Sequence, residues 1–141
     1  MRTLVAILFS SLLCFNASAS TLQDSLKKLQ AYSAKDFEAA KDEAAVGEKT
    51  QEMLKTVEQT VDTAVAAKEK VSEDVLKELV RVSVLTFEHD PSEAASEILL
   101  PLYKKEKKAF EKALKSLPKK EAKELEESLM NASREDDEGN G

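Results

Sequence analysis

The chain has 141 residues, with 21 basic and 27 acidic side chains, a net charge of −6 and one cysteine. This length fits one domain of ordinary size. The acidic balance argues against nonspecific binding of nucleic acid by the domain as a whole, and a lone cysteine excludes a disulfide within the chain.

The first nineteen residues have the pattern of a cleavable secretory signal peptide. Arg2 supplies a positive start, residues 4–15 form an uncharged apolar stretch, and Ala17, Ser18 and Ala19 are the small residues that signal peptidases accept. The stretch is shorter than the roughly 20 residues of a membrane-spanning helix, so we expect cleavage after Ala19 and no transmembrane segment. The mature protein is therefore predicted to be periplasmic or secreted.

The cysteine lies at position 14, within the predicted signal peptide. Leu13 precedes it, whereas a lipid-attachment motif requires a small residue there, so we expect no lipid anchor. Cleavage removes Cys14 and Arg2 and leaves 20 basic against 27 acidic side chains, a net charge of −7. The mature helical domain, residues 20–132, must then fold without a disulfide in an oxidising compartment.

Glycine and proline are scarce after residue 19, and apolar residues recur at spacings of three and four. This periodicity predicts an all-α fold, an antiparallel bundle of four to five amphipathic helices. A first helix is predicted over 21–32, and a second from Asp36 toward Lys70, with a bend or short break near Gly47.

A third helix is predicted from Glu73 to Phe87, with the Ser72 hydroxyl as its N-terminal cap. Few polar residues interrupt its apolar positions, so we expect it to be central and covered on more than one side.

The fourth predicted helix begins with a capping box. Asp90 is the expected cap, Pro91 the first helical residue, and Glu93 the residue whose side chain reaches back to the cap. Pro101 is expected to kink or split this helix.

After Pro118, a last helix is predicted over about 119–132, where apolar residues again recur at helical spacing. The acidic tail, residues 133–141, is too polar to bury a face and is expected to be disordered.

Lysines between residues 104 and 123 form the main candidate binding feature, because this segment holds nine lysines and three glutamates. Four of them share one face of the fourth predicted helix: Lys104, Lys108, Lys112 and Lys115. The pattern indicates an electrostatic contact with an anionic protein, a lipid surface or the chain's own acidic segments. A plain solvated face, balanced by the net −6 of residues 124–141, is the alternative. Nucleic acid is not an expected partner, because no aromatic residues alternate with the lysines for base stacking.

His89, the only histidine, has Glu88, Asp90 and Glu93 close by and is an alternative candidate for a metal site or an acid–base group. One histidine and no mature cysteine fall short of a zinc site, and no nucleophile elbow or phosphate-binding loop is present. We therefore predict a nonenzymatic binding, adaptor or structural protein without a cofactor. A further alternative is a homo-oligomer that associates through apolar seams on the helices at 36–70 and 122–132.

Overall fold

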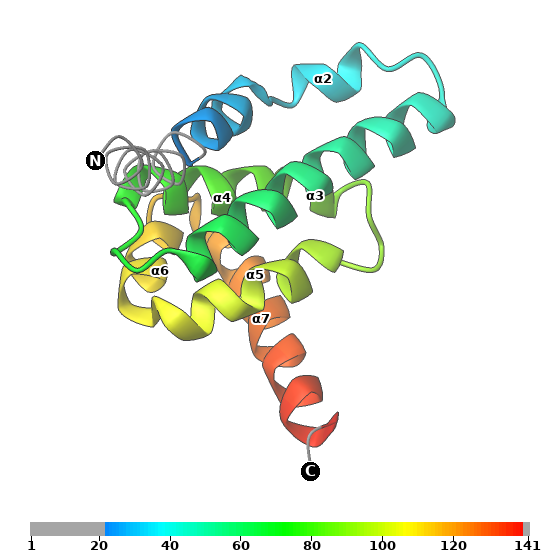
Figure 1. The fold of residues 1–141 in the computed structure, drawn as a ribbon. Coiled ribbons are helices and arrows are strands. Elements are labelled where there is room, and N and C mark those ends of the chain that lie inside the picture. Colours follow the sequence, from blue (N-terminus) through cyan, green and yellow to red (C-terminus); the bar gives the residue numbers. More distant parts are fainter. Residues whose placement is uncertain (1–21, 140–141) are drawn as a thin grey trace, which may run out of the picture.

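A computed structural model describes residues 22–139, and every regular element in this range is a helix (Figure 1). The all-α prediction is therefore confirmed. The predicted signal peptide, its cleavage site and Cys14 lie outside the described residues. Over the described range, no helix combines the length and the apolar character needed to cross a bilayer.

The N-terminal part contains a helical segment at residues 22–31, the short helix α2 (Lys35–Glu38) and the long helix α3 (Glu43–Ala66). The predicted break near Gly47 was wrong, because Gly47 lies within α3 and the chain is interrupted between α2 and α3 instead. Asp42 explains the position: its backbone is extended, and its carboxylate accepts a hydrogen bond from the Ala45 N–H at 2.8 Å. An aspartate cap satisfies an N–H group that would otherwise be unpaired, so α3 begins there.

Helix α4 (Glu73–Phe87) has the predicted bounds, and its predicted central position is confirmed. The Ser72 hydroxyl accepts a hydrogen bond from the Val75 N–H at 3.4 Å, as expected for the cap. The helix contacts α3 and three helices that follow it, α5, α6 and α7. Leu76, Leu79 and Val80 are fully buried in these contacts, so α4 holds the N-terminal and C-terminal halves of the fold together.

Helix α5 (Ala94–Lys105) begins later than the capping box predicted. The Asp90 carboxylate accepts hydrogen bonds from the N–H groups of Ser92 and Ala94, at 3.1 and 2.9 Å, so Asp90 caps a turn that ends at Ala94. Glu93 adopts a left-handed conformation with φ 51° and does not reach back to Asp90. Instead its carboxylate accepts a hydrogen bond from the Ser128 hydroxyl of α7 at 2.6 Å. This contact ties a strained turn to a distant helix.

Pro101 lies inside α5 and does not split it, and the break comes at Glu106, before α6 (Lys107–Leu114). A straight helix would place Glu106 on the apolar stripe, between Leu102 and Phe110, both of which are fully buried. The non-helical backbone of Glu106, with φ −121° and ψ 41°, keeps this residue only partly buried and redirects the chain. Consequently α5 packs mainly on α3 and α7, whereas α6 packs on α4.

Helix α7 runs from Lys119 to Gly139, past the predicted end at residue 132. Residues 133–139 are therefore helical, and the prediction of a disordered tail was wrong for them. In Figure 1 the end of this helix projects away from the rest of the molecule. A long-range ion pair reaches this extension, in which the Lys104 ammonium on α5 donates to the Asp136 carboxylate at 2.6 Å.

The hydrophobic core combines residues from every part of the described chain. Leu29 comes from the helical segment 22–31, Met53 from α3, Leu99 from α5, Phe110 from α6 and Leu125 from α7, and all are fully buried. Helix α6 is amphipathic as a result, with its apolar side in the core and its lysines in solvent.

Candidate functional site

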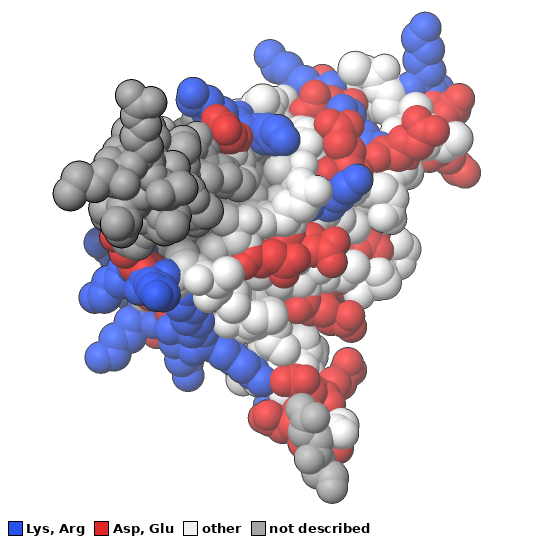
Figure 2. All heavy atoms as spheres, viewed as in Figure 1, with Lys and Arg blue, Asp and Glu red and all other residues white. Residues whose placement is uncertain are grey.

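Lysines gather at one end of the molecule, over the end of α5 and over α6, as Figure 2 shows. The same view shows acidic side chains over α3 and over the projecting end of α7. Charges of the two signs are thus separated in the lower part of this view, whereas they are mixed over its upper part. We use the name lysine surface for a set of exposed residues in this region, Lys104, Lys107, Lys108, Lys112, Lys115 and Lys119.

Lys104, the first of the four predicted binding lysines, is separated from the other three by the break at Glu106. The predicted face of one continuous helix is therefore wrong. The Lys104 ammonium lies 2.6 Å from a carboxylate oxygen of Asp136 and 3.9 Å from one of Asp137. The hydrogen bond to Asp136 raises the pKa of Lys104. Lys104 is therefore directed toward the acidic end of α7.

Lys112 is directed toward the start of α4. Its ammonium donates a hydrogen bond to the Glu73 carboxylate at 3.0 Å, and Lys77 pairs with the same carboxylate at 2.9 Å. Hydrogen bonds from Lys77 and then from Lys112 lower the pKa of Glu73. This shared carboxylate joins α6 to α4, although all three side chains are substantially exposed and the pairs are screened by solvent.

The ammonium groups of Lys108 and Lys115 make no hydrogen bond or ion pair within residues 22–139. The same is true of two further lysines that flank them, Lys107 and Lys119, and all four side chains are exposed. These cations are the part of the lysine surface that the fold itself does not use.

Several of these lysines occupy positions that do not favour helix stability. Lys107 and Lys108 lie in the first turn of α6, and Lys119 and Lys120 lie in the first turn of α7. The N-terminal end of a helix carries a partial positive charge, so cations there are unfavourable by a few tenths of a kcal/mol or more, roughly, at exposed sites. Lys120 pairs with Glu124 one turn later in α7, at 3.8 Å, but helix formation does not explain the lysines at positions 107, 108 and 119.

Lys105 has a structural role that sequence reasoning missed. Its ammonium donates hydrogen bonds to the carbonyl oxygens of Ala64, Val65 and Ala67, at 2.9, 3.1 and 2.7 Å. These carbonyls lie at the end of α3, which has no basic residue in its own last turn. A cation at this negative end stabilises the helix. The only signal in the sequence is the absence of a basic residue from the last turn of α3. This absence does not indicate which distant lysine supplies the positive charge there.

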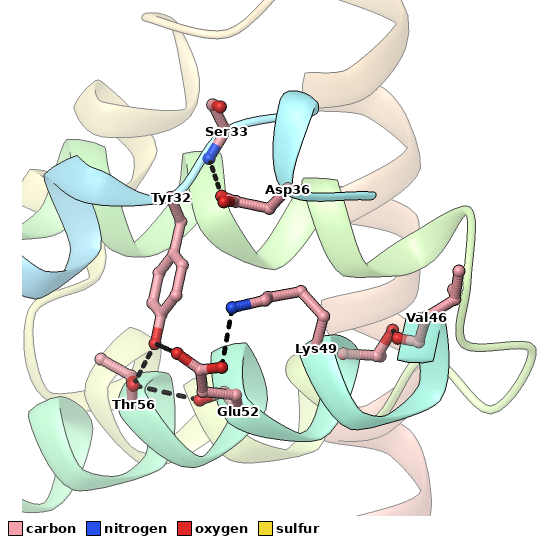
Figure 3. Close-up of polar contacts among 8 residues, drawn as sticks. Tyr32, Ser33, Asp36, Val46, Lys49, Glu52 and Thr56 are labelled. Carbon is pink, nitrogen blue, oxygen red and sulfur yellow. Dashed lines mark hydrogen bonds and ion pairs between the residues drawn. The ribbon is translucent and has the colours of Figure 1, made fainter. Parts of the chain in front are cut away.

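A second polar cluster, shown in Figure 3, joins the N-terminal part to α3. The Tyr32 hydroxyl points down onto α3, where it donates to the Glu52 carboxylate at 3.1 Å and lies 3.0 Å from the Thr56 hydroxyl. Lys49 pairs with the other oxygen of Glu52 at 2.8 Å. Burial is the main reason why the pKa of Tyr32 is raised. Each polar group in the cluster has a partner in the fold, which indicates a structural role.

His89, the alternative candidate for a metal site, stacks on the Phe37 ring of α2 with 4.0 Å between ring centroids. Its neighbour Asp90 uses both carboxylate oxygens for the turn before α5. Within the range that the structure covers, no three or more histidine, cysteine, aspartate or glutamate side chains form a group able to hold a metal ion. The geometry around His89 is that of a packed turn.

A groove of about 450 Å³ lies between α3 and the turn before α5. Its lining mixes apolar side chains with polar ones: Gln51, Leu54, Lys55, Glu58, Asp90, Ser92, Ala94 and Ile98. Asp90 belongs to the turn, as described above, and among residues 22–139 no buried side-chain nitrogen or oxygen lacks a hydrogen-bond partner. The groove therefore presents no buried polar group that awaits a ligand.

The residues expected to form apolar seams for self-association are used inside the fold. Val57 and Val61 of α3 and Leu125 and Leu129 of α7 are all at most 2% exposed. The large apolar side chains exposed in the described part are Val65, at 38%, and Met130, at 46%. These two do not form a continuous stripe on one helix.

Comparison with known proteins gives no relatives: no family model, no curated protein and no solved structure matches this chain.

Proposed function

We propose that this chain is an exported, nonenzymatic binding or adaptor protein that docks an anionic partner on its lysine surface. Lys108 and Lys115, together with Lys107 and Lys119, would make the primary contacts. Lys104 and Lys112 would contribute by exchanging their present carboxylate partners for the ligand. The observation that carries the proposal is the set of exposed ammonium groups at one end of an acidic protein that have no partner within residues 22–139.

Charge segregation supports this proposal. A protein with a net charge of −6 repels anions on average, so attraction requires a local concentration of cations. Residues 104–123 provide one, and four lysines within it have no partner among residues 22–139 that would have to be displaced.

The chemistry of the surface indicates recognition by charge. Its cations are lysines, which are strongly hydrated point charges and lack the planar fork with which arginine binds carboxylate or phosphate in a bidentate manner. Phe110, Ala113 and Leu114 on the other side of α6 are buried in the core, so they are not accessible to a partner. Binding of this kind is sensitive to salt, because exposed charges are screened over about 8 to 10 Å at physiological ionic strength.

Retention of the purified protein on dextran sulfate beads, with elution by a salt gradient, tests the docking proposal. We expect retention at low salt and earlier elution of the double variant Lys108→Gln/Lys115→Gln. The matched control is Lys35→Gln/Lys41→Gln, which removes the same charge from α2 and the segment after it and should elute like the original protein. A protein that flows through the beads at low salt would overturn the proposal.

Export is a separate proposal, which rests on the pattern of residues 1–19. We expect the protein recovered from outside the cytoplasm to begin at Ser20, which intact-mass measurement and N-terminal sequencing would reveal. Recovery of the chain in the cytoplasm with its first nineteen residues intact would contradict export and leave the charge-based docking proposal to be judged by itself.

A further inference from the structure

The lysine surface extends onto a segment distant in sequence, the loop between α3 and α4. Lys105, at the end of α5, contacts the carbonyl of Ala67, where the loop begins, and Lys112 of α6 contacts Glu73, where the loop ends. The loop is thus held at its start by the end of α5 and at its end by α6, and Figure 1 shows the loop beside α6. Val71 is buried and anchors the loop in the core.

Two lysines of this loop, Lys68 and Lys70, are exposed and make no hydrogen bond or ion pair in the described range. They lie between the two points at which this loop contacts Lys105 and Lys112, which brings the α3–α4 loop and α6 into one basic region. The sequence did not reveal this, because about forty residues separate the two segments.

The surroundings of the site disfavour a flat anionic surface as its ligand. The Lys104 ammonium lies 2.6 Å from Asp136, so the acidic end of α7 adjoins the lysines, and Figure 2 shows it projecting below them. A broad anionic membrane would meet these carboxylates together with the lysines. Membrane-surface helices also insert an apolar face, and the apolar side of α6 is buried. A narrow chain would contact the cations without meeting the acidic end.

The site also lacks the groups that recognise proteins or bases. Protein interfaces usually centre on aromatic or aliphatic anchors, and the large apolar side chain exposed near the site is Val65, only 38% accessible. Tyr103, the nearest candidate for stacking, packs edge-on against buried Phe110 with 5.4 Å between centroids. What remains is a cluster of exposed ammonium groups, which suits a ligand with a high density of negative charge.

We propose that Lys68 and Lys70 of the loop and the unpaired lysines of α6 form one site for a linear polyphosphate chain. The inference rests on the docking function proposed above and names its ligand class. Lysine ammonium groups bind phosphate oxygens as point charges, and a linear chain of phosphates presents such oxygens at high density along a narrow path.

Fluorescence anisotropy with end-labelled linear polyphosphate measures binding and tests the inference. Sedimentation with vesicles that contain phosphatidylglycerol measures binding to a membrane surface. Competition by dextran sulfate and by polyglutamate measures binding to other linear polyanions. Each lysine that contacts phosphate should contribute about one unit to the slope of the logarithm of the binding constant against the logarithm of the salt concentration. We therefore expect Lys68→Gln/Lys70→Gln to lower that slope by about two and to weaken binding about tenfold or more at low salt. The control Lys35→Gln/Lys41→Gln should change neither.

The outcomes separate the two proposals. Tighter binding of polyphosphate than of vesicles or the other two polymers, with loss in the loop variant, supports the inference. Tighter binding of vesicles, dextran sulfate or polyglutamate, or an unchanged slope in the loop variant, would overturn the inference while the docking function stands. Absence of binding to every anion at low salt would overturn both. All four substituted lysines are exposed, so we expect the fold of each variant to be intact. Circular dichroism checks this.

Discussion

Two polar regions along α3 use their charges in different ways. In the first half of the helix, Glu52 receives hydrogen bonds from Tyr32 and Lys49, so the charged groups there are paired within the fold. Beyond its C-terminal end, Lys105 is satisfied by backbone carbonyls, but its neighbours Lys107 and Lys108 have no partner in the described range. The comparison distinguishes charges that join parts of the fold from charges that remain available to another molecule.

The largest expected effect comes from Arg81, which anchors the Tyr32 region to α4. Its guanidinium donates to the carbonyls of Leu29 and Tyr32, both at 2.8 Å, and pairs with Glu78 at 2.7 Å. Arg81→Met should lower the free energy of unfolding by about 2 to 3 kcal/mol, because charged hydrogen bonds to two carbonyls are lost. Urea denaturation measures this change.

The matched control for Arg81 is Arg134→Met on α7, where the arginine is exposed and has no partner within residues 22–139. This variant should unfold at the same urea concentration as the original protein. Equal destabilisation by the two substitutions would remove the distinction between paired and available charges.

Lys105 and Lys107 sharpen the comparison, since they differ by two positions in sequence but differ completely in their contacts. Lys105→Met should lower the free energy of unfolding by about 1 to 2 kcal/mol, because the end of α3 loses its cation and three carbonyls lose a donor. Lys107→Met should leave the urea midpoint unchanged. A reversed order of the two midpoints would contradict the structural assignment of Lys105.

Tyr32→Phe removes only the hydroxyl of the paired region, so its effect should be smaller. Loss of the bonds to Glu52 and Thr56 should lower the free energy of unfolding by about 1 kcal/mol. Tyr103→Phe is the control in urea denaturation, since the Tyr103 ring contributes through its contact with Phe110 and keeps that contact without the hydroxyl.

Tyr32 is also expected to make the free energy of unfolding depend on pH. Burial, the largest influence, raises the pKa of Tyr32, so the folded state favours the neutral hydroxyl. The stabilisation from the neutral Tyr32 hydroxyl is complete below about pH 10, the pKa of tyrosine in the unfolded state. It is lost as the pH rises through the higher pKa of Tyr32 in the folded state. Between pH 9 and 11, roughly, the urea midpoint should fall more steeply for the original protein than for Tyr32→Phe. Parallel curves would show that Tyr32 does not titrate differently in the two states.

The fold was predictable wherever local sequence signals agreed with packing. Helix α4 has the predicted bounds because Ser72 caps it and its apolar residues repeat at helical spacing. Asp90 also caps the chain, but the helix starts at Ala94 because Glu93 bonds Ser128, a residue 35 positions away. A capping pattern covers only neighbouring residues, so it gives no information about that distant contact.

The break between α5 and α6 had a signal in the sequence, since Glu106 interrupts the apolar stripe at a position that a straight helix would bury. The sequence pattern predicts a kink or split at Pro101 instead, but that proline is exposed and lies within the continuous helix α5. For the candidate site, sequence identified a concentration of lysines but not their partners. The contacts of Lys104 and Lys112 span 32 and 39 residues and depend on how the helices pack.

The acidic end of α7 is expected to respond most weakly, and it tests whether charge pairing extends this helix beyond the predicted end. Acids in a last helical turn oppose the helix dipole, so residues 133–139 need external support. Lys104→Gln removes one such support and should speed amide hydrogen exchange a few-fold in 133–139 only. Lys108→Gln makes the same charge change but removes no carboxylate contact within residues 22–139, so it should leave these amides unchanged. High salt should mimic Lys104→Gln. Equal exchange in the two variants would mean that contacts other than Lys104 hold the acidic end in its helix.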